Sequence, residues 1–226
     1  MRSAATAVPD GQIIDITLGI ETGMPVWPGD PPVVVEPVAT LAGGDPASVS
    51  ALRLGTHTGT HVDPPAHFVE GGATVDQLDL AVLVGPAVVV DLRGRSGPLE
   101  PADLEGAGLP AGVERVLLRT DNSARWDRPE TGLPETWVAV SPAGARWLVD
   151  HGIRLVGVDA LSIEAPTDDG YPVHRILLGA GVVLVEGLVL SHAEAGPYVL
   201  ACLALKIVGG DGAPVRAVLV RGALGA

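Results

Sequence analysis

The chain is short of the residues on which several classes of protein depend. Cys202 is the single cysteine among 226 residues, so neither an intrachain disulfide nor a zinc site built on paired cysteines can form. Lysine and arginine number 14 against 27 aspartate and glutamate residues, which gives a formal net charge of −13. Nucleic acids and anionic membranes require a basic surface patch, and we therefore expect neither as a partner.

Long apolar runs are also missing. The most apolar stretches, 81–90 and 182–190, are too short or too interrupted to span a bilayer. Residues 1–9 contain one arginine and no apolar stretch of the length that a signal peptide requires. These absences predict a soluble, cytoplasmic protein.

Aromatic residues make up only 3% of the chain although 47% of it is hydrophobic, which predicts a core of Val, Leu, Ile and Ala. Cys202 lies in the apolar run 198–208 and is expected to be a small buried hydrophobe. A chain of this length can bury well over half of its unfolded surface. Because it shows no repeat, linker or second core, we expect residues 1–226 to form a single domain.

Short β-branched segments predict most of the regular structure. Helices are fewer, and the clearest begins at Ser141-Pro142, with serine as N-cap and proline in the first turn. Strands mixed with few helices predict one α/β domain with a substantial mixed sheet. The expected strands are 12–18, 87–92, 115–120, 155–159, 182–186, 198–208 and 215–221, with a hairpin formed by 33–40 and 49–55. The expected helical segments are 101–107, 142–150 and 174–178, and 76–84 is expected to be a short helix or a turn.

Three of the six histidines lie close together at His57, His61 and His67, with Asp63 between them. An extended strand, at about 3.3 Å per residue, would hold His57 and His61 too far apart to share one ion. A helix is disfavoured by Gly59, its β-branched neighbours and two prolines. The stretch therefore predicts a tight bend that presents imidazoles and a carboxylate to a divalent metal such as zinc or manganese. The alternative is a polar surface loop.

Two later residues extend this candidate site. Glu186 ends an apolar strand, where a charge is costly unless it is paired or binds a metal. His174 precedes the turn 179–181, which would fold it back beside that strand. Each could instead be an ordinary surface residue. Trp27, in the turn-rich Trp-Pro-Gly-Asp loop, either covers one end of the core or lines a pocket. We assign no role to His151 or His192.

At these residues the chain resembles a known family. The stretch 57–67 matches the H-x-G-T-H-x-D-x-P-x-H signature of the metal-dependent cyclase family, which includes bacterial kynurenine formamidase and isatin hydrolase. The loop 27–30 and the segment 213–219 also resemble the formamidases. The resemblance implies a swivelling β/α/β-like fold and a homo-oligomer, either a dimer or a tetramer. The isatin-hydrolase branch holds one manganese, whereas the formamidases pair the signature with a downstream histidine and glutamate and hold two zinc ions. Because the chain has both His174 and Glu186 at this spacing, the resemblance implies two zinc ions per chain. The first zinc would be bound by His57, His61 and Asp63, and the second by the bridging Asp63 with His174 and Glu186, of which Glu186 contacts both.

The activity that the resemblance implies is hydrolysis of an aryl formamide. The substrate would be N-formyl-L-kynurenine, an intermediate of tryptophan catabolism, which would give kynurenine and formate. His67 would act as general acid and base toward a metal-activated water, and Trp27 would stack on the aryl group. His67 could instead be another metal ligand. Relatives with the same ligands open lactone, imide or cyclic diketone rings, or are described as polyketide cyclases.

Other classes of function fit less well. A serine hydrolase with a nucleophile elbow is excluded, because the chain contains no Gly-x-Ser-x-Gly sequence. A non-catalytic metal-binding module would have little use for His67 and Trp27. The glycines between 106 and 112 are mis-spaced for a phosphate loop.

Overall fold

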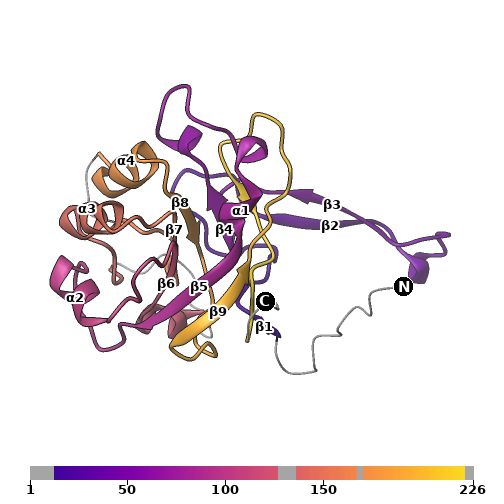
Figure 1. Ribbon diagram of the computed structural model, residues 1–226. Coiled ribbons are helices and arrows are strands. Elements are labelled where there is room, and N and C mark those ends of the chain that lie inside the picture. Colours follow the sequence, from indigo (N-terminus) through magenta and orange to yellow (C-terminus); the bar gives the residue numbers. More distant parts are fainter. Residues whose placement is uncertain (1–12, 127–135, 167–169, 222–226) are drawn as a thin grey trace, which may run out of the picture.

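The computed structural model describes residues 13–126, 136–166 and 170–221. Within these ranges, a mixed sheet has the strand order β1-β11-β9-β5-β6-β7-β8-β4-β10 (Figure 1). Its strands are β1 (Ile13–Asp15), β4 (His61–Asp63), β5 (Val84–Asp91), β6 (Arg115–Arg119), β7 (Leu155–Val158), β8 (Val183–Glu186), β9 (Gly196–Ala201), β10 (Ala213–Pro214) and β11 (Val218–Val220). The predicted mixed sheet with few helices is confirmed.

The centre of the sheet is parallel, and antiparallel strands flank it. Strands β5, β6, β7 and β8 pair in parallel, whereas β4 runs antiparallel to β8 and β9 antiparallel to β5. Parallel strands are usually covered on both faces, which explains their continuous Val and Leu runs. Alternate side chains of β6 accordingly enter two different apolar clusters, with Val116 and Leu118 in one and Leu117 in the other.

Three helices cover one face of the parallel strands: α2 (Pro101–Gly106), α3 (Pro142–Asp150) and α4 (Pro172–Gly179) (Figure 1). The predicted start of α3 is confirmed, because the Ser141 hydroxyl accepts a hydrogen bond from the Gly144 N–H at 2.9 Å. The opposite face is closed by strands of the curled sheet itself, with Leu117 packed among residues of β8, β9 and β11. A Cβ at Gly157 would lie 2.3 Å from Leu117 Cδ2, so the packing in β7 requires a glycine there.

A hairpin of β2 (Val34–Ala39) and β3 (Val49–Arg53) extends away from the rest of the chain (Figure 1). The predicted hairpin is thus confirmed. Both of its faces are accessible, and they expose the large apolar side chains Val38, Leu41, Val49 and Leu52. An isolated two-stranded hairpin is marginally stable in water.

Several predicted boundaries were wrong. The histidine stretch is a bend only over 56–60, after which His61–Asp63 forms strand β4 with partners on both sides. The predicted strand 198–208 ends at Ala201, and residues 203–208 expose Leu203, Leu205 and Val208. The short helix or turn predicted at 76–84 is present, as a 3-10 turn, Val75–Gln77, followed by the short helix α1 (Leu80–Leu83). In the described residues, every helix is too short or too polar to cross a membrane.

Candidate metal centre

The sheet register brings three of the predicted ligands to one place. His61 and Asp63 are two residues apart on β4, so their side chains lie on the same face. Across the β4–β8 pair, His61 is directly opposite Glu186. Opposed residues hold their Cβ atoms about 4.5–5.5 Å apart. His61 Nε2 accordingly lies 3.3 Å from Asp63 Oδ1 and 3.5 Å from Glu186 Oε2.

The bend before β4 is attached to the chain just after Glu186. Gly59 has a φ of 62°, a left-handed conformation that favours glycine. The Thr60 hydroxyl accepts from the Leu18 N–H at 2.7 Å and donates to the Gly187 carbonyl at 2.6 Å. A Cβ at Gly187 would lie 2.2 Å from the Gly59 carbonyl oxygen. The bend can therefore approach the end of β8 this closely only because residue 187 is glycine, whereas Gly59 allows the turn itself.

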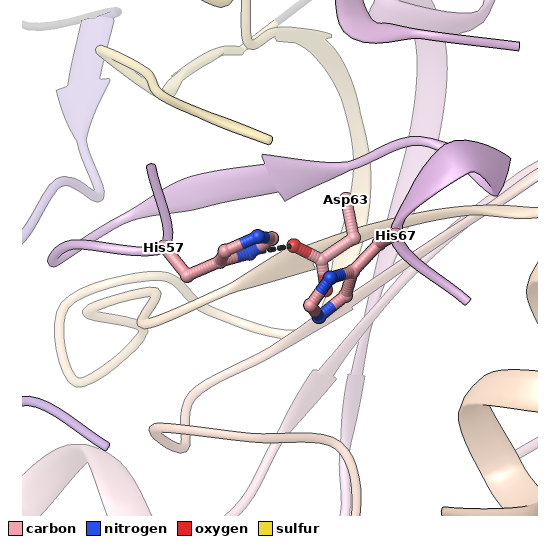
Figure 2. A group of neighbouring side chains, drawn as sticks. All are labelled: His57, Asp63 and His67. Atoms are coloured by element: carbon pink, nitrogen blue, oxygen red, sulfur yellow. Dashed lines mark hydrogen bonds and ion pairs between the residues drawn. The ribbon is translucent and has the colours of Figure 1, made fainter. Parts of the chain in front are cut away.

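His57 and His67 approach Asp63 from the two ends of this segment. Figure 2 shows the three side chains pointing toward one another, with His57 before β4 and His67 after it. His57 Nδ1 is 2.7 Å from Asp63 Oδ1, and the rings of His57 and His67 stack with centroids 3.9 Å apart. On the other side of Asp63, His174 Nε2 of α4 lies 3.8 Å from Oδ2 and 3.3 Å from Glu186 Oε1. The other five predicted ligand and proton-transfer residues thus gather around the carboxylate of Asp63.

The buried carboxylates of this cluster require positive charge beside them. Burial opposes protonation of His61, but Asp63 and Glu186 outweigh it and raise the His61 pKa to about 9. Burial likewise opposes protonation of His174, but its hydrogen bonds to Glu164 and Glu186 raise the pKa to about 10. The pKa of Asp63 lies well below its usual value, because the adjacent imidazoles outweigh the effect of burial. Protons on the histidines thus balance the buried carboxylates, as a bound cation would.

The donor set fits a divalent metal. His57, Asp63 and His67 form one group, and His61, Asp63 and Glu186 form another, with one donor atom from each residue within 4.8 Å of the others. Asp63 belongs to both groups and is fully buried, yet its Oδ2 has no hydrogen-bond partner among the described residues. A buried carboxylate oxygen without a partner is costly unless it binds something. Imidazole nitrogens and carboxylate oxygens suit zinc or a similar ion.

Comparison with known proteins identifies the family of the chain. The family described as "Putative cyclase" matches residues 14–165. The chain belongs to this cyclase family. Two similar proteins are the kynurenine formamidase of Salinibacter ruber, 42% identical over 92% of this chain and 96% of that protein, and cyclase-like protein 3 of Oryza sativa subsp. japonica, 39% identical over 97% and 86%.

Solved structures agree with this placement. One titled as a potential metal-dependent hydrolase with cyclase activity is 35% identical, has a TM-score of 0.79, and matches over 93% of this chain and 98% of its own. Isatin hydrolase A from Labrenzia aggregata is 26% identical, also has a TM-score of 0.79, and matches over 92% of each chain. The fold of this cyclase-family chain is therefore shared by metal-dependent hydrolases.

A pocket opens beside the cluster of this cyclase-family chain, and Trp27 is one of the residues that line it. The Trp27 ring lies 6.3 Å from Tyr171 and edge-on to Trp137 at 6.1 Å. Phe68 continues the aromatic wall, 5.2 Å from Tyr171. Asp30, from the same loop as Trp27, and Leu161 and Ser162, from the loop after β7, complete the lining.

Sequence reasoning missed several of these neighbours. Tyr171 and Phe68 carried no pattern of their own, although each lies within three residues of a predicted site histidine. Among the residues that the structure describes, Tyr171 is the one residue other than glycine with a left-handed φ, at 53°. This backbone conformation in a non-glycine residue often marks a functional site. Glu164 and Asp211 contact His174 and His57, respectively, from distant segments. By contrast, His151 and His192 are exposed and lie outside the cluster, consistent with the absence of a predicted role.

Proposed function

We propose that the protein is a metal-dependent hydrolase that cleaves N-formyl-L-kynurenine to kynurenine and formate. The observation that carries this proposal is Asp63, a buried carboxylate shared by two potential ligand groups beside an aromatic pocket. The formamidase relatives, which match over nearly their whole length, support the choice of an aryl formamide. We further propose that residues 1–226 form one hydrolase domain.

The centre would hold two zinc ions, with manganese as the alternative metal. His57, His61 and Asp63 would bind the first ion, and Asp63, His174 and Glu186 would bind the second, with Glu186 contacting both. Such ions, when bound, supply Lewis acidity toward the substrate carbonyl and lower the pKa of a bound water into the neutral range. The separation of His57 from His174 on opposite sides of Asp63 supports two ions rather than one.

His67 would move the proton. Burial and the neighbouring histidines lower its pKa, although the nearby Asp63 opposes the shift. The ring is therefore neutral at physiological pH and can accept a proton from the attacking water. It then donates that proton to the amine nitrogen as the C–N bond breaks, which releases formate and the free arylamine. The stack of His67 on His57 holds its ring at the edge of the cluster, beside the pocket.

The aromatic wall would recognise the aryl group. Trp27, Tyr171 and Phe68 present ring surfaces to the same pocket that His67 and Glu186 enter from the metal side. A flat substrate that stacks on these rings would place its formamide group against the ligand cluster. This arrangement supports an aromatic formamide rather than an aliphatic one.

The experiment is metal analysis and turnover of N-formyl-L-kynurenine by the zinc-reconstituted protein and its His67→Ala variant. We expect two zinc ions in both proteins and a loss of turnover of about 10²- to 10⁴-fold in the variant, the usual contribution of general acid–base catalysis. His151→Ala is the control, because His151 is exposed and packs on Trp147 away from the site. Loss of metal from the His67→Ala variant would make His67 a ligand and contradict its role as proton shuttle.

A second candidate is hydrolysis of a cyclic imide or lactone. The likeness to isatin hydrolase A supports it, as does the aromatic pocket, which would also accept a fused ring. Turnover of isatin without release of formate from the formamide would favour this alternative.

We also propose that the protein is a cytoplasmic homo-oligomer, either a dimer or a tetramer. The projecting hairpin supports the oligomer, because its exposed Val38, Leu41, Val49 and Leu52 would be covered by a second copy.

A further inference from the structure

Glu164 is a buried carboxylate that the proposed function leaves without a role. Its side chain is fully buried, and it accepts hydrogen bonds from the Val173 N–H at 2.8 Å, the His174 N–H at 3.3 Å and His174 Nδ1 at 2.6 Å. The two backbone groups belong to the first turn of α4, which has no intrahelical partners for its N–H groups. Glu164 therefore fixes the start of α4 and the ring of His174 together.

The third hydrogen bond decides which nitrogen of His174 faces the metal centre. An ionised carboxylate can only accept, so Nδ1 carries a hydrogen and donates it to Glu164. Nε2 then faces Glu186 and Asp63, at 3.3 Å and 3.8 Å from their nearest oxygens. A metal binds an unprotonated nitrogen, and the other nitrogen of a ligating histidine almost always donates its hydrogen to a carboxylate, a backbone carbonyl or water. Glu164 is placed to act in this way.

The residues next to Glu164 orient the other ligand of the second ion. Oε1 of Glu186 accepts from the Ile163 N–H at 2.7 Å and from the Ser162 hydroxyl at 3.4 Å. The carbonyl of Glu164 in turn accepts from the Trp137 indole N–H at 2.8 Å. One short segment, 162–164, thus holds both His174 and Glu186.

We propose that Glu164 is a positioning residue that sets the affinity of the second metal ion by holding His174 in the Nδ1–H tautomer. This inference rests on the two-ion centre proposed above. Glutamine at this position would have one oxygen and one NH₂ group for three N–H donors. With the NH₂ toward His174, the ring must turn away or move its hydrogen to Nε2, where it blocks the metal. With the NH₂ toward Val173, the N–H of Val173 loses its acceptor, and the Nδ1–H of His174 is held only by a neutral amide oxygen, which is a weaker acceptor than a carboxylate.

The test is a stepwise zinc titration of the metal-free wild type and its Glu164→Gln variant, in competition with a chromophoric chelator. We expect the first binding step to be unchanged and the second to weaken by about 10- to 100-fold, the usual effect of removing a carboxylate behind a histidine ligand. Cobalt replaces zinc in a parallel titration, because its visible absorption reports the ligands. The bands that develop with the second equivalent should shift in the variant, whereas those of the first should not.

Asp159→Asn is the matched control. Asp159 lies five residues earlier, is equally buried, and accepts hydrogen bonds from Thr120 and Ser123, which lie outside the ligand cluster. This control should leave both zinc affinities unchanged even if it lowers the stability of the fold. An unchanged second step in Glu164→Gln, or equal weakening of that step in Asp159→Asn, would overturn the positioning role alone. A wild type that binds a single ion would overturn the two-ion centre and this inference together.

Discussion

Gly212 offers a direct test of whether the geometry of His57 matters for metal binding. Gly212 precedes β10 and lies against the flat face of the His57 ring, where an added Cβ would be 2.5 Å from Cε1 and 2.9 Å from Nε2. Its φ lies outside the left-handed range, so alanine is allowed by the backbone. The Gly212→Ala substitution therefore acts through the contact with His57.

The size of the effect follows from that contact. The ring must move by about 1 Å to restore ordinary van der Waals separation from the new methyl group. It cannot move straight back, because His67 stacks on it at 3.9 Å. Metal–ligand distances tolerate only about ±0.2 Å, so His57 is displaced as a ligand. We expect the first zinc site to lose at least about 100-fold in affinity, the upper end of the range for changes behind a ligand.

The fold should hardly change, because the His57 side chain is partly exposed and can swing outward. We expect the free energy of unfolding of the metal-free variant to differ by less than about 1 kcal/mol from wild type. Chelator competition measures the affinity, and urea unfolding in the presence of a chelator measures the stability. Gly106→Ala in α2 is the control, since an added Cβ there contacts nothing within 4 Å. Wild-type zinc affinity in Gly212→Ala would refute the assignment of His57 as a ligand.

Two further predictions concern the metal-free protein and the pocket. The pKa values of His61 and His174, about 9 and about 10, lie above the ordinary value of 6.5, so the folded metal-free protein binds more protons than the unfolded chain. Its stability should therefore be highest between about pH 4 and 6.5, because the lowered pKa of Asp63 removes stability in more acidic solution, and should fall as the pH rises to about 10. Urea unfolding that shows the opposite slope between about pH 6.5 and 10 would contradict these pKa values. Trp27→Ala should raise KM for N-formyl-L-kynurenine by about 3- to 10-fold with little change in kcat, as expected for loss of one aromatic contact of about 0.5–1.5 kcal/mol. An equal rise in KM for a formamide that lacks an aryl ring would argue against stacking.

The sequence was most informative where local chemistry decides the structure. The cap of Ser141 followed by proline predicted α3, and the short β-branched segments predicted the strands of the mixed sheet. These signals need only neighbouring residues, because a cap or an apolar run has the same meaning in many folds. The spacing of His57, His61 and Asp63 was similarly local, and it predicted the bend that the structure shows at Gly59.

The contacts of the site histidines could not be predicted in the same way, because their partners lie outside the local sequence. Glu164 contacts His174 from ten positions away, and Asp211 contacts Thr56 and His57 from the other end of the chain. Neither acidic residue differs from an ordinary surface residue in the sequence. Strand β4 was missed because it has only three residues and follows a glycine-containing bend, and its pairing with β8 and β10 stabilises it more than its own propensity does.

The register of β4 against β8 explains why His61, Asp63 and Glu186 can act as one centre. Side chains alternate between the faces of a strand, so a slip of one residue would move Val62 into the cluster and His61 out of it. The register is fixed by the Thr60 hydroxyl bond to Gly187 and by the close approach of Gly59 to the same residue. Gly187 directly follows Glu186 in the chain. The contact that sets the register is therefore adjacent to the ligand that the register must place, which couples folding of this sheet edge to assembly of the site.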